Sequence, residues 1–115
     1  MTFANVNVNQ QQLTLLSQLL LTAFPGCTIH QSRDPMRAAQ RLSTYQVDVI
    51  FADADTCPDL IRMLRRKKSG PPICLLCRQD LPPTEDTDGI QAIVTYPITQ
   101  QKIQTALQSK TVESA

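Results

Sequence analysis

The fold is decided by residues 47–53, which read Val-Asp-Val-Ile-Phe-Ala-Asp. Apart from Asp48, the residues before the final aspartate are apolar, and several of them are β-branched or aromatic. Such a run is typical of a strand that is buried on both faces of a parallel sheet. The stretch therefore predicts a central strand that ends at Asp53. Parallel sheets usually carry their functional sites at that end of the strands.

Other strands and helices are predicted on both sides of this one. Four stretches have the alternating or continuously apolar patterns of strands, at 3–8, 27–30, 72–77 and 91–95. Four stretches between or after them have helical spacing or helix caps, at 10–24, 34–45, 55–68 and 98–107. Because strands alternate with helices, right-handed crossovers and a mostly parallel sheet are expected.

Two details of the predicted core can be tested. In the second helix, Met36, Ala39 and Leu42 recur at the spacing of an inward face. In the first strand, Asn5 and Asn7 fall on the same face. Buried amides need hydrogen-bond partners, so this strand predicts either a wetter face or a shifted register.

The composition limits the function classes. The chain has 115 residues, which suits one domain, here 1–109 with a frayed tail at 110–115. Its net charge of +1 provides no field that would attract nucleic acid or an anionic membrane, so neither is expected as a partner. No apolar run could span a bilayer and no signal-peptide pattern is present, so a cytoplasmic location is expected. Gly-x-Gly and Gly-Lys-Ser/Thr phosphate loops do not occur in the sequence.

The Cys-x-x-Cys pair at Cys74 and Cys77 falls within a predicted strand. Residues three apart in a strand point to opposite faces, so the two sulfurs could not bind one metal ion. The chain has one histidine, His30, with no nucleophile motif around it. We therefore expect no metal site, no cofactor and no enzymatic activity.

Three stretches, at 47–53, 71–77 and 89–98, resemble in their order and spacing the receiver domain of bacterial response regulators. The resemblance runs from Phe3 to about Gln108. It implies an α/β, flavodoxin-like three-layer sandwich with a five-stranded parallel sheet of order 2-1-3-4-5. The segment between Cys77 and Gly89 is shorter than in that family and rich in Pro and acids. The fourth helix is therefore expected to be shortened or absent.

The resemblance also implies a site at the carboxyl edge of the sheet. Asp53 matches the phosphoacceptor, whereas Asn9 and Gln10 stand where the family has an acidic pair that holds Mg²⁺. Cys77 replaces the family's Thr or Ser, and Tyr96 replaces its Lys. Neutral amides anchor Mg²⁺ much more weakly than carboxylates do, and without metal and Lys a phosphoryl group would be poorly neutralised. We therefore expect a degenerate receiver in which phosphorylation is disfavoured.

The expected function is a phosphorylation-independent regulatory module that acts by protein contacts in signal transduction or transcriptional regulation. One alternative is a working two-component receiver that is phosphorylated on Asp53 with Mg²⁺. Another is a small flavodoxin-like ligand-binding or redox protein, although residues 9–12 read Asn-Gln-Gln-Gln instead of a phosphate loop.

The expected partner is another protein or a fused output domain. The resemblance also implies a weak homodimer through a surface that includes Val94, Tyr96 and Thr99. The basic run from Arg62 to Lys68 is interpreted as a solvated helix end, because the net charge is close to zero.

Overall fold

The computed structural model describes residues 1–42, 44, 46–55, 58–65, 71–78 and 90–114. The strands within these ranges are β1 (Thr2–Val6), β2 (Thr28–Ser32), β3 (Val49–Asp53), β4 (Ile73–Cys77) and β5 (Ile90–Thr95). The helices are α1 (Gln10–Ala23), α2 (Pro35–Leu42), α3 (Pro58–Arg65) and α4 (Gln100–Ser114). The alternating order predicted from the sequence is confirmed.

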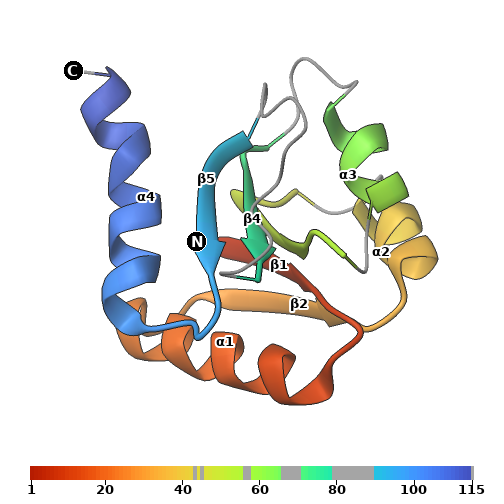
Figure 1. The fold of residues 1–115 in the computed structure, drawn as a ribbon, viewed down its shortest axis with the longest axis horizontal. Coiled ribbons are helices and arrows are strands. Elements are labelled where there is room, and N and C mark those ends of the chain that lie inside the picture. Colours follow the sequence, from red (N-terminus) through yellow and green to blue (C-terminus); the bar gives the residue numbers. More distant parts are fainter. Residues whose placement is uncertain (43, 45, 56–57, 66–70, 79–89, 115) are drawn as a thin grey trace.

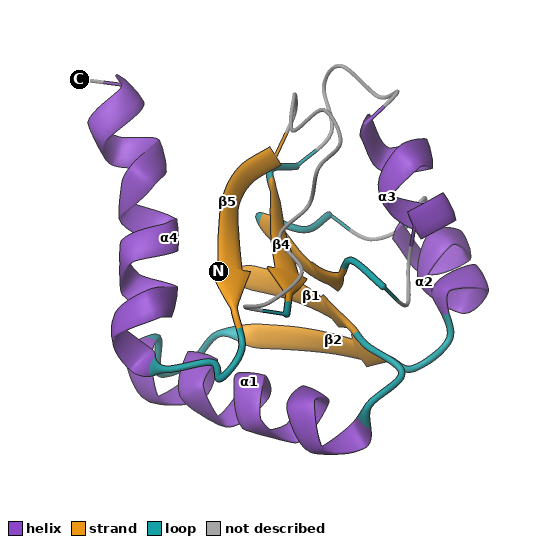
Figure 2. Ribbon diagram, in the orientation of Figure 1, coloured by secondary structure: helices purple, strands orange, loops and turns teal. Residues whose placement is uncertain are grey.

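The strands form one parallel sheet in the order β2-β1-β3-β4-β5. Helices α1 and α4 cover one face of the sheet, and α2 and α3 cover the other (Figures 1 and 2). This is the three-layer sandwich and the strand order that the resemblance implied. The helix expected to be shortened or absent falls at 79–89, which lies outside the described residues.

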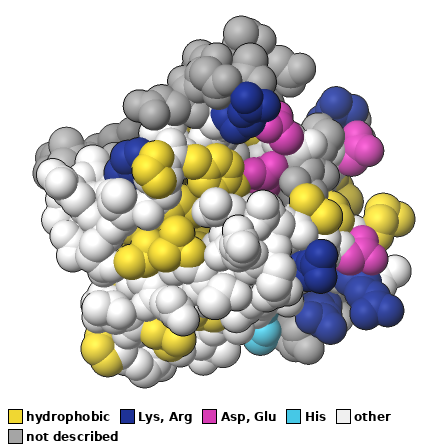
Figure 3. Space-filling view, turned by 60° about the horizontal axis from the view of Figure 1, so that its bottom comes forward, with side chains coloured by type: hydrophobic (Ala, Val, Ile, Leu, Met, Phe, Trp, Pro, Cys, Tyr) yellow, Lys and Arg dark blue, Asp and Glu magenta, His cyan; other side chains and the backbone are white. Residues whose placement is uncertain are grey.

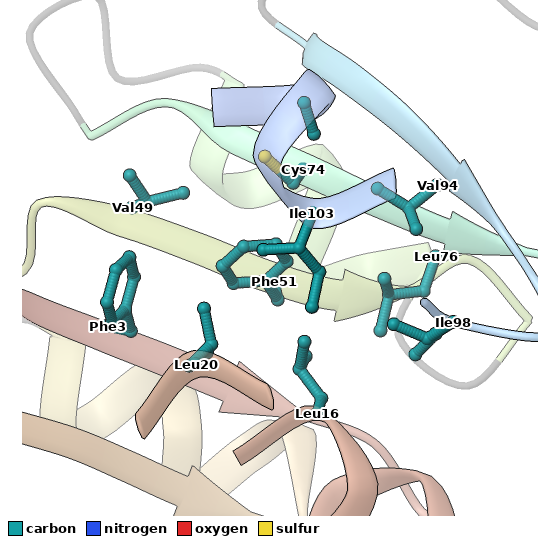
Figure 4. Close-up of a cluster of buried hydrophobic side chains, with 11 residues drawn as sticks. Phe3, Leu16, Leu20, Val49, Phe51, Cys74, Leu76, Val94, Ile98 and Ile103 are labelled. Atoms are coloured by element: carbon teal, nitrogen blue, oxygen red, sulfur yellow. The ribbon is translucent and has the colours of Figure 1, made fainter. Parts of the chain in front are cut away.

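Each layer of helices encloses its own apolar cluster. Alternate residues of a strand point to opposite faces, so in β3 Phe51 faces α1 and α4 while Ile50 and Ala52 face α2 and α3. The cluster on the α1 and α4 side is drawn in Figure 4 and includes the rings of Phe3 and Phe51. It consists of Phe3, Leu16, Leu20, Val49, Phe51, Cys74, Leu76, Val94, Ile98, Ile103 and Ala106.

Both asparagines of the predicted first strand are buried, Asn5 within β1 and Asn7 just after it. Asn5 is fully buried, and its Nδ2 donates to the Leu13 carbonyl oxygen at 3.1 Å and to Ser17 Oγ at 3.2 Å. Both acceptors belong to α1, so the amide ties the strand to the helix that covers it. The expected register therefore holds, and this face is not open to solvent.

Local signals set the ends of the first two helices. Asn9 caps α1 by accepting from the Gln12 N–H at 3.1 Å, and Gly26 follows the helix with φ of 87°, a backbone conformation that favours glycine. Asp34 accepts from the Met36 N–H at 3.0 Å, and Pro35 is the first residue of α2. Both helix starts agree with the sequence prediction.

Two helix predictions need correction. Met36 does not face the core, because its side chain is 73% exposed and Ala38 is the buried residue of α2. Ala39 and Leu42 pack against the same cluster from partly buried positions, so the predicted inward face is wrong only at Met36. Helix α4 begins at Gln100 rather than at 98, since Thr99 accepts the Lys102 N–H at 3.2 Å as its cap. It also continues to Ser114, through the segment predicted to be a frayed tail.

In the described part of the chain, no helix has both the length and the apolar character that a membrane span requires.

Candidate functional site

Three polar side chains meet at the carboxyl edge of the sheet, on the side of α1 and α4. Asn7 follows β1, Asp53 ends β3 and Tyr96 follows β5. Each lies an even number of residues beyond a core residue of that face, namely Phe3, Phe51 or Val94. Because side chains alternate along a strand, the three residues continue the same face upward from the apolar cluster.

A hydrogen-bonded chain joins these three residues. The Tyr96 hydroxyl donates to Asp53 Oδ2, and Asn7 Nδ2 donates to the Tyr96 oxygen at 2.9 Å. The second carboxylate oxygen of Asp53 accepts the Asp55 N–H at 3.0 Å. Asp53 is only 6% exposed, and both of its oxygens are engaged. We call the side chains of Asn7, Asp53 and Tyr96 the closed triad.

Asn7 also connects the triad to α1. Its Oδ1 accepts the Asn9 N–H at 3.0 Å, and Asn9 in turn caps the helix. Asn7 is 2% exposed, so its amide is desolvated and committed to these contacts. The triad is thus fixed to three strand ends and to the first turn of one helix.

Neither Asn9 nor Gln10, the residues predicted for the acidic-pair positions, joins the triad. Val6 pairs with Ala52 across β1 and β3, so the residue beside Asp53 in the sheet is Asn7. Asn9 is instead the helix cap, and the side chain of Gln10 is exposed and donates to Thr14 at 3.2 Å. Asn7 was recognisable as a polar residue in an otherwise buried strand, but its role depends on the strand register.

The two cysteines of the Cys-x-x-Cys pair lie on opposite faces of β4, as predicted. Cys74 belongs to the α1 and α4 cluster, and burial raises the pKa of its thiol to about 12. Cys77 ends β4 near the triad, and its pKa is raised first by burial and then by Asp55 and Asp53. Both cysteines are free thiols. A raised pKa keeps each sulfur protonated and poorly nucleophilic at neutral pH.

Tyr96 is held as a hydrogen-bond donor. Burial raises the pKa of its phenol above the usual range, and the hydrogen bond to Asp53 and the charge of that carboxylate raise it further. Asn7, which donates to the phenol oxygen, opposes this shift. The proton therefore stays on Tyr96 at neutral pH, and the hydroxyl shields the carboxylate of Asp53.

The donor set does not suit Mg²⁺. This ion prefers several carboxylate oxygens in an octahedral arrangement. Here the Asp53 carboxylate is occupied by hydrogen bonds, and its neighbour Asn7 offers a neutral amide that is already bonded on both sides. Among the described residues, no group of three His, Cys, Asp or Glu side chains could hold a metal ion.

The predicted partner surface is only partly accessible. Val94 is 2% exposed and packs in the α1 and α4 cluster, so it cannot contact a partner in this structure. Tyr96 is half-buried with its hydroxyl in the triad, and Thr99 is exposed. The strand residue that does face outward is Ile93, at 43% exposure. Val94 was misplaced because period-two alternation alone does not say which face of an edge strand is covered.

The comparisons with known proteins support the receiver fold. No protein-family model matches the sequence. The chain is similar to the chemotaxis response regulator CheY4 of Vibrio cholerae, with a TM-score of 0.78 and 17% identity over 93% of this chain and 95% of that one. It is also similar to the receiver domain of an HD domain-containing protein from Pseudomonas fluorescens, with a TM-score of 0.77 and 22% identity over 97% and 94% of the two chains.

A third similar structure is the receiver domain of a sensor histidine kinase from Pseudomonas aeruginosa, which holds a coordinated magnesium ion. Its TM-score is 0.75, with 20% identity over 93% of both chains. A curated protein, stress response regulator protein 1 of Scheffersomyces stipitis, is 29% identical over 69 residues. That match covers 56% of this chain and 24% of the length of the relative. The chain therefore has the CheY-like receiver fold.

Proposed function

We propose that this chain is a phosphorylation-independent, receiver-like module that regulates a signalling protein through direct contacts. The receiver fold supports a regulatory role in signal transduction. The observation that carries the finer proposal is the closed triad, in which both oxygens of the buried Asp53 carboxylate are already hydrogen-bonded.

The chemistry of phosphoryl transfer explains why the triad disfavours phosphorylation. The acceptor oxygen must be free to attack, and nearby cations must neutralise the transferred group. Tyr96 covers one acceptor oxygen with a neutral hydroxyl, and Asn7 adds a neutral amide. A phosphoryl group on Asp53 would break the bond to Tyr96 and add negative charge near Asp55.

The contact surface that we favour lies over β5 and α4. An open groove of about 560 Å³ runs there, and apart from Lys102 it is lined by uncharged residues, among them Ile93, Thr99, Gln101 and Thr105. An exposed β-branched side chain beside a polar rim is a feature of protein contact sites. An Ile93→Glu substitution should weaken binding of the partner protein, or of a second copy as measured by light scattering.

A two-dimensional amide NMR titration tests the proposal. The protein is titrated with Mg²⁺ and then with Mg²⁺ plus beryllofluoride, which mimics a phosphoryl group on aspartate. We expect no saturable shifts at Asp53, Cys77 or Tyr96 in millimolar Mg²⁺, with or without beryllofluoride. Saturable shifts that disappear in Asp53→Asn would contradict the proposal and establish a working phosphoacceptor.

A second arm of the same experiment introduces a carboxylate and an ammonium group beside Asp53. In the double variant Asn7→Asp with Tyr96→Lys, the triad loses its hydroxyl and gains a carboxylate and an ammonium near Asp53. Because these groups bind Mg²⁺ and neutralise a phosphoryl group, we expect this variant to respond to the same titration. A silent response in both proteins would mean that closure by Tyr96 is not what prevents the chemistry.

A further inference from the structure

One lysine on α4 makes an unusual set of contacts just behind the triad. Lys102 Nζ donates to the Thr95 carbonyl oxygen at 3.0 Å, to Thr95 Oγ1 at 3.2 Å and to the Pro97 carbonyl oxygen at 3.0 Å. An ammonium group has three protons, so its donor capacity is fully used. The two residues that accept are the neighbours of Tyr96 on either side.

The position of Lys102 is not one that helix stability favours. It is the third residue of α4, close to the helix N-terminus, where the helix dipole disfavours a positive charge. Its side chain is partly buried, so it also loses part of its hydration. The three charge-assisted hydrogen bonds offset both effects and fix the connection between β5 and α4.

This connection determines where the Tyr96 side chain points. Thr95 is the last residue of β5 and Thr99 caps α4, so Tyr96 lies within a short link between strand and helix. The Tyr96 N–H also donates to the Cys77 carbonyl oxygen at 3.0 Å, which anchors the strand side of the link. Lys102 is the group that anchors the same link to α4 through its side chain.

We propose that Lys102 is a positioning residue that couples α4 to the closed triad, so that displacement of the first turn of α4 releases Tyr96 from Asp53. The inference rests on the proposed function, because it names how a bound partner would change the site. A partner that contacts the groove between β5 and α4 would act on this turn directly, since Lys102 also lines that groove.

The Tyr96 hydroxyl proton provides a direct readout. A buried hydroxyl that is hydrogen-bonded to a carboxylate exchanges slowly with water and gives a downfield proton resonance. We expect this resonance in the unmodified protein, and its loss in Tyr96→Phe assigns it. In Lys102→Met, which keeps the length of the apolar stem, we expect exchange of this proton to become at least tenfold faster. Lys102→Arg should restore slow exchange because the guanidinium retains the charge and the donors.

Two controls separate positioning from general destabilisation. Gln104→Met replaces an exposed polar residue on the same helix and should leave the exchange rate unchanged. Thr95→Val removes only the acceptor Oγ1 and should accelerate exchange by a smaller factor, which keeps the test available if Lys102→Met does not fold.

Either of two results would overturn the coupling. One is an unchanged exchange rate in folded Lys102→Met, and the other is the absence of a protected hydroxyl resonance in the unmodified protein. Failure of the proposed function looks different, because the beryllofluoride titration would then give saturable shifts in the unmodified protein while the dependence on Lys102 persisted.

Discussion

Both faces of the sheet are covered by two helices, but the side chains buried under the helices differ between the two faces. The cluster under α1 and α4 contains Phe3 and Phe51, whose ring centroids lie 6.0 Å apart. The cluster under α2 and α3 contains no aromatic residue among its described members and includes three alanines, Ala4, Ala38 and Ala52. The aromatic rings therefore lie under the long helices α1 and α4, and most of the buried alanines lie under the short helices α2 and α3.

The outer surfaces of the two layers differ as well. Helix α1 contains no Asp, Glu, Lys or Arg, whereas α2 carries exposed Arg37 and Arg41 and α3 carries the ion pair of Arg62 with Asp59. In Figure 3 the surface of α1 is mostly uncharged, and basic side chains gather toward the side of α2. The closed triad continues the face of the sheet that α1 and α4 cover.

The largest change in stability is expected when a core side chain is truncated on each side of the sheet. Phe51→Ala should lower the free energy of unfolding by about 4 kcal/mol, because it removes a fully buried ring and leaves a cavity. Leu60→Ala, on the α2 and α3 side, should lower it by about 2 to 3 kcal/mol. Urea denaturation measures both values. An equal or larger loss at Leu60 would contradict the view that the α1 and α4 side dominates stability.

A smaller effect is expected in the triad itself. Tyr96→Phe removes the hydroxyl that donates to the buried carboxylate of Asp53, so stability at pH 7 should fall by about 2 kcal/mol. Thr14→Val removes an exposed hydroxyl that accepts from Gln10, and as the control it should cost less. If the two variants proved equally stable, the hydrogen bond to Asp53 would contribute little to folding.

The same bond predicts a pH dependence with a definite sign. The pKa of Tyr96 is raised in the folded protein above the ordinary tyrosine value of 10.0. As the pH rises above about 10, the unfolded phenol ionises first, so the free energy of unfolding should fall. Tyr96→Phe should lack this part of the slope. A slope identical to that of the unmodified protein in alkaline denaturation would refute the assignment.

Removal of a helix cap should lower the free energy of unfolding by the same amount on both sides of the sheet. Asn9→Ala removes the cap of α1, and Asp34→Ala removes the cap of α2. Each should lower stability by about 1 kcal/mol, because a cap satisfies local backbone donors whatever the volume of the core beneath the helix. A markedly larger loss for Asn9→Ala in thermal unfolding would show that this cap also supports the triad through Asn7.

The smallest effects are expected at exposed apolar residues. Leu15→Lys on α1 and Met36→Lys on α2 should each change stability by no more than about 0.5 kcal/mol, since both side chains are substantially exposed. Circular dichroism melting curves measure the change. A larger loss for Leu15→Lys would mean that this side of α1 is covered, and light scattering would then show whether a second copy covers it.

Much of the fold could be read from the sequence because it follows from local patterns. The apolar run at 47–53 gave a central strand ending at Asp53, and Asp34 with Pro35 gave the start of a helix. The exposure of Met36 on α2 could not be read in the same way. Met36 and Ala38 both suit an inward position by spacing, and the choice depends on how closely the helix approaches the sheet.

The candidate site divides in a similar way. The sequence by itself determined that Asp53 ends the central strand and that Tyr96 follows the last one, since strand ends are local features. Only the tertiary structure decided that Asn7, rather than Asn9 or Gln10, joins them. The physical reason is that a hydrogen bond between residues 7 and 96 depends on the registers between four strands, β1, β3, β4 and β5. No spacing along the chain encodes those registers by itself.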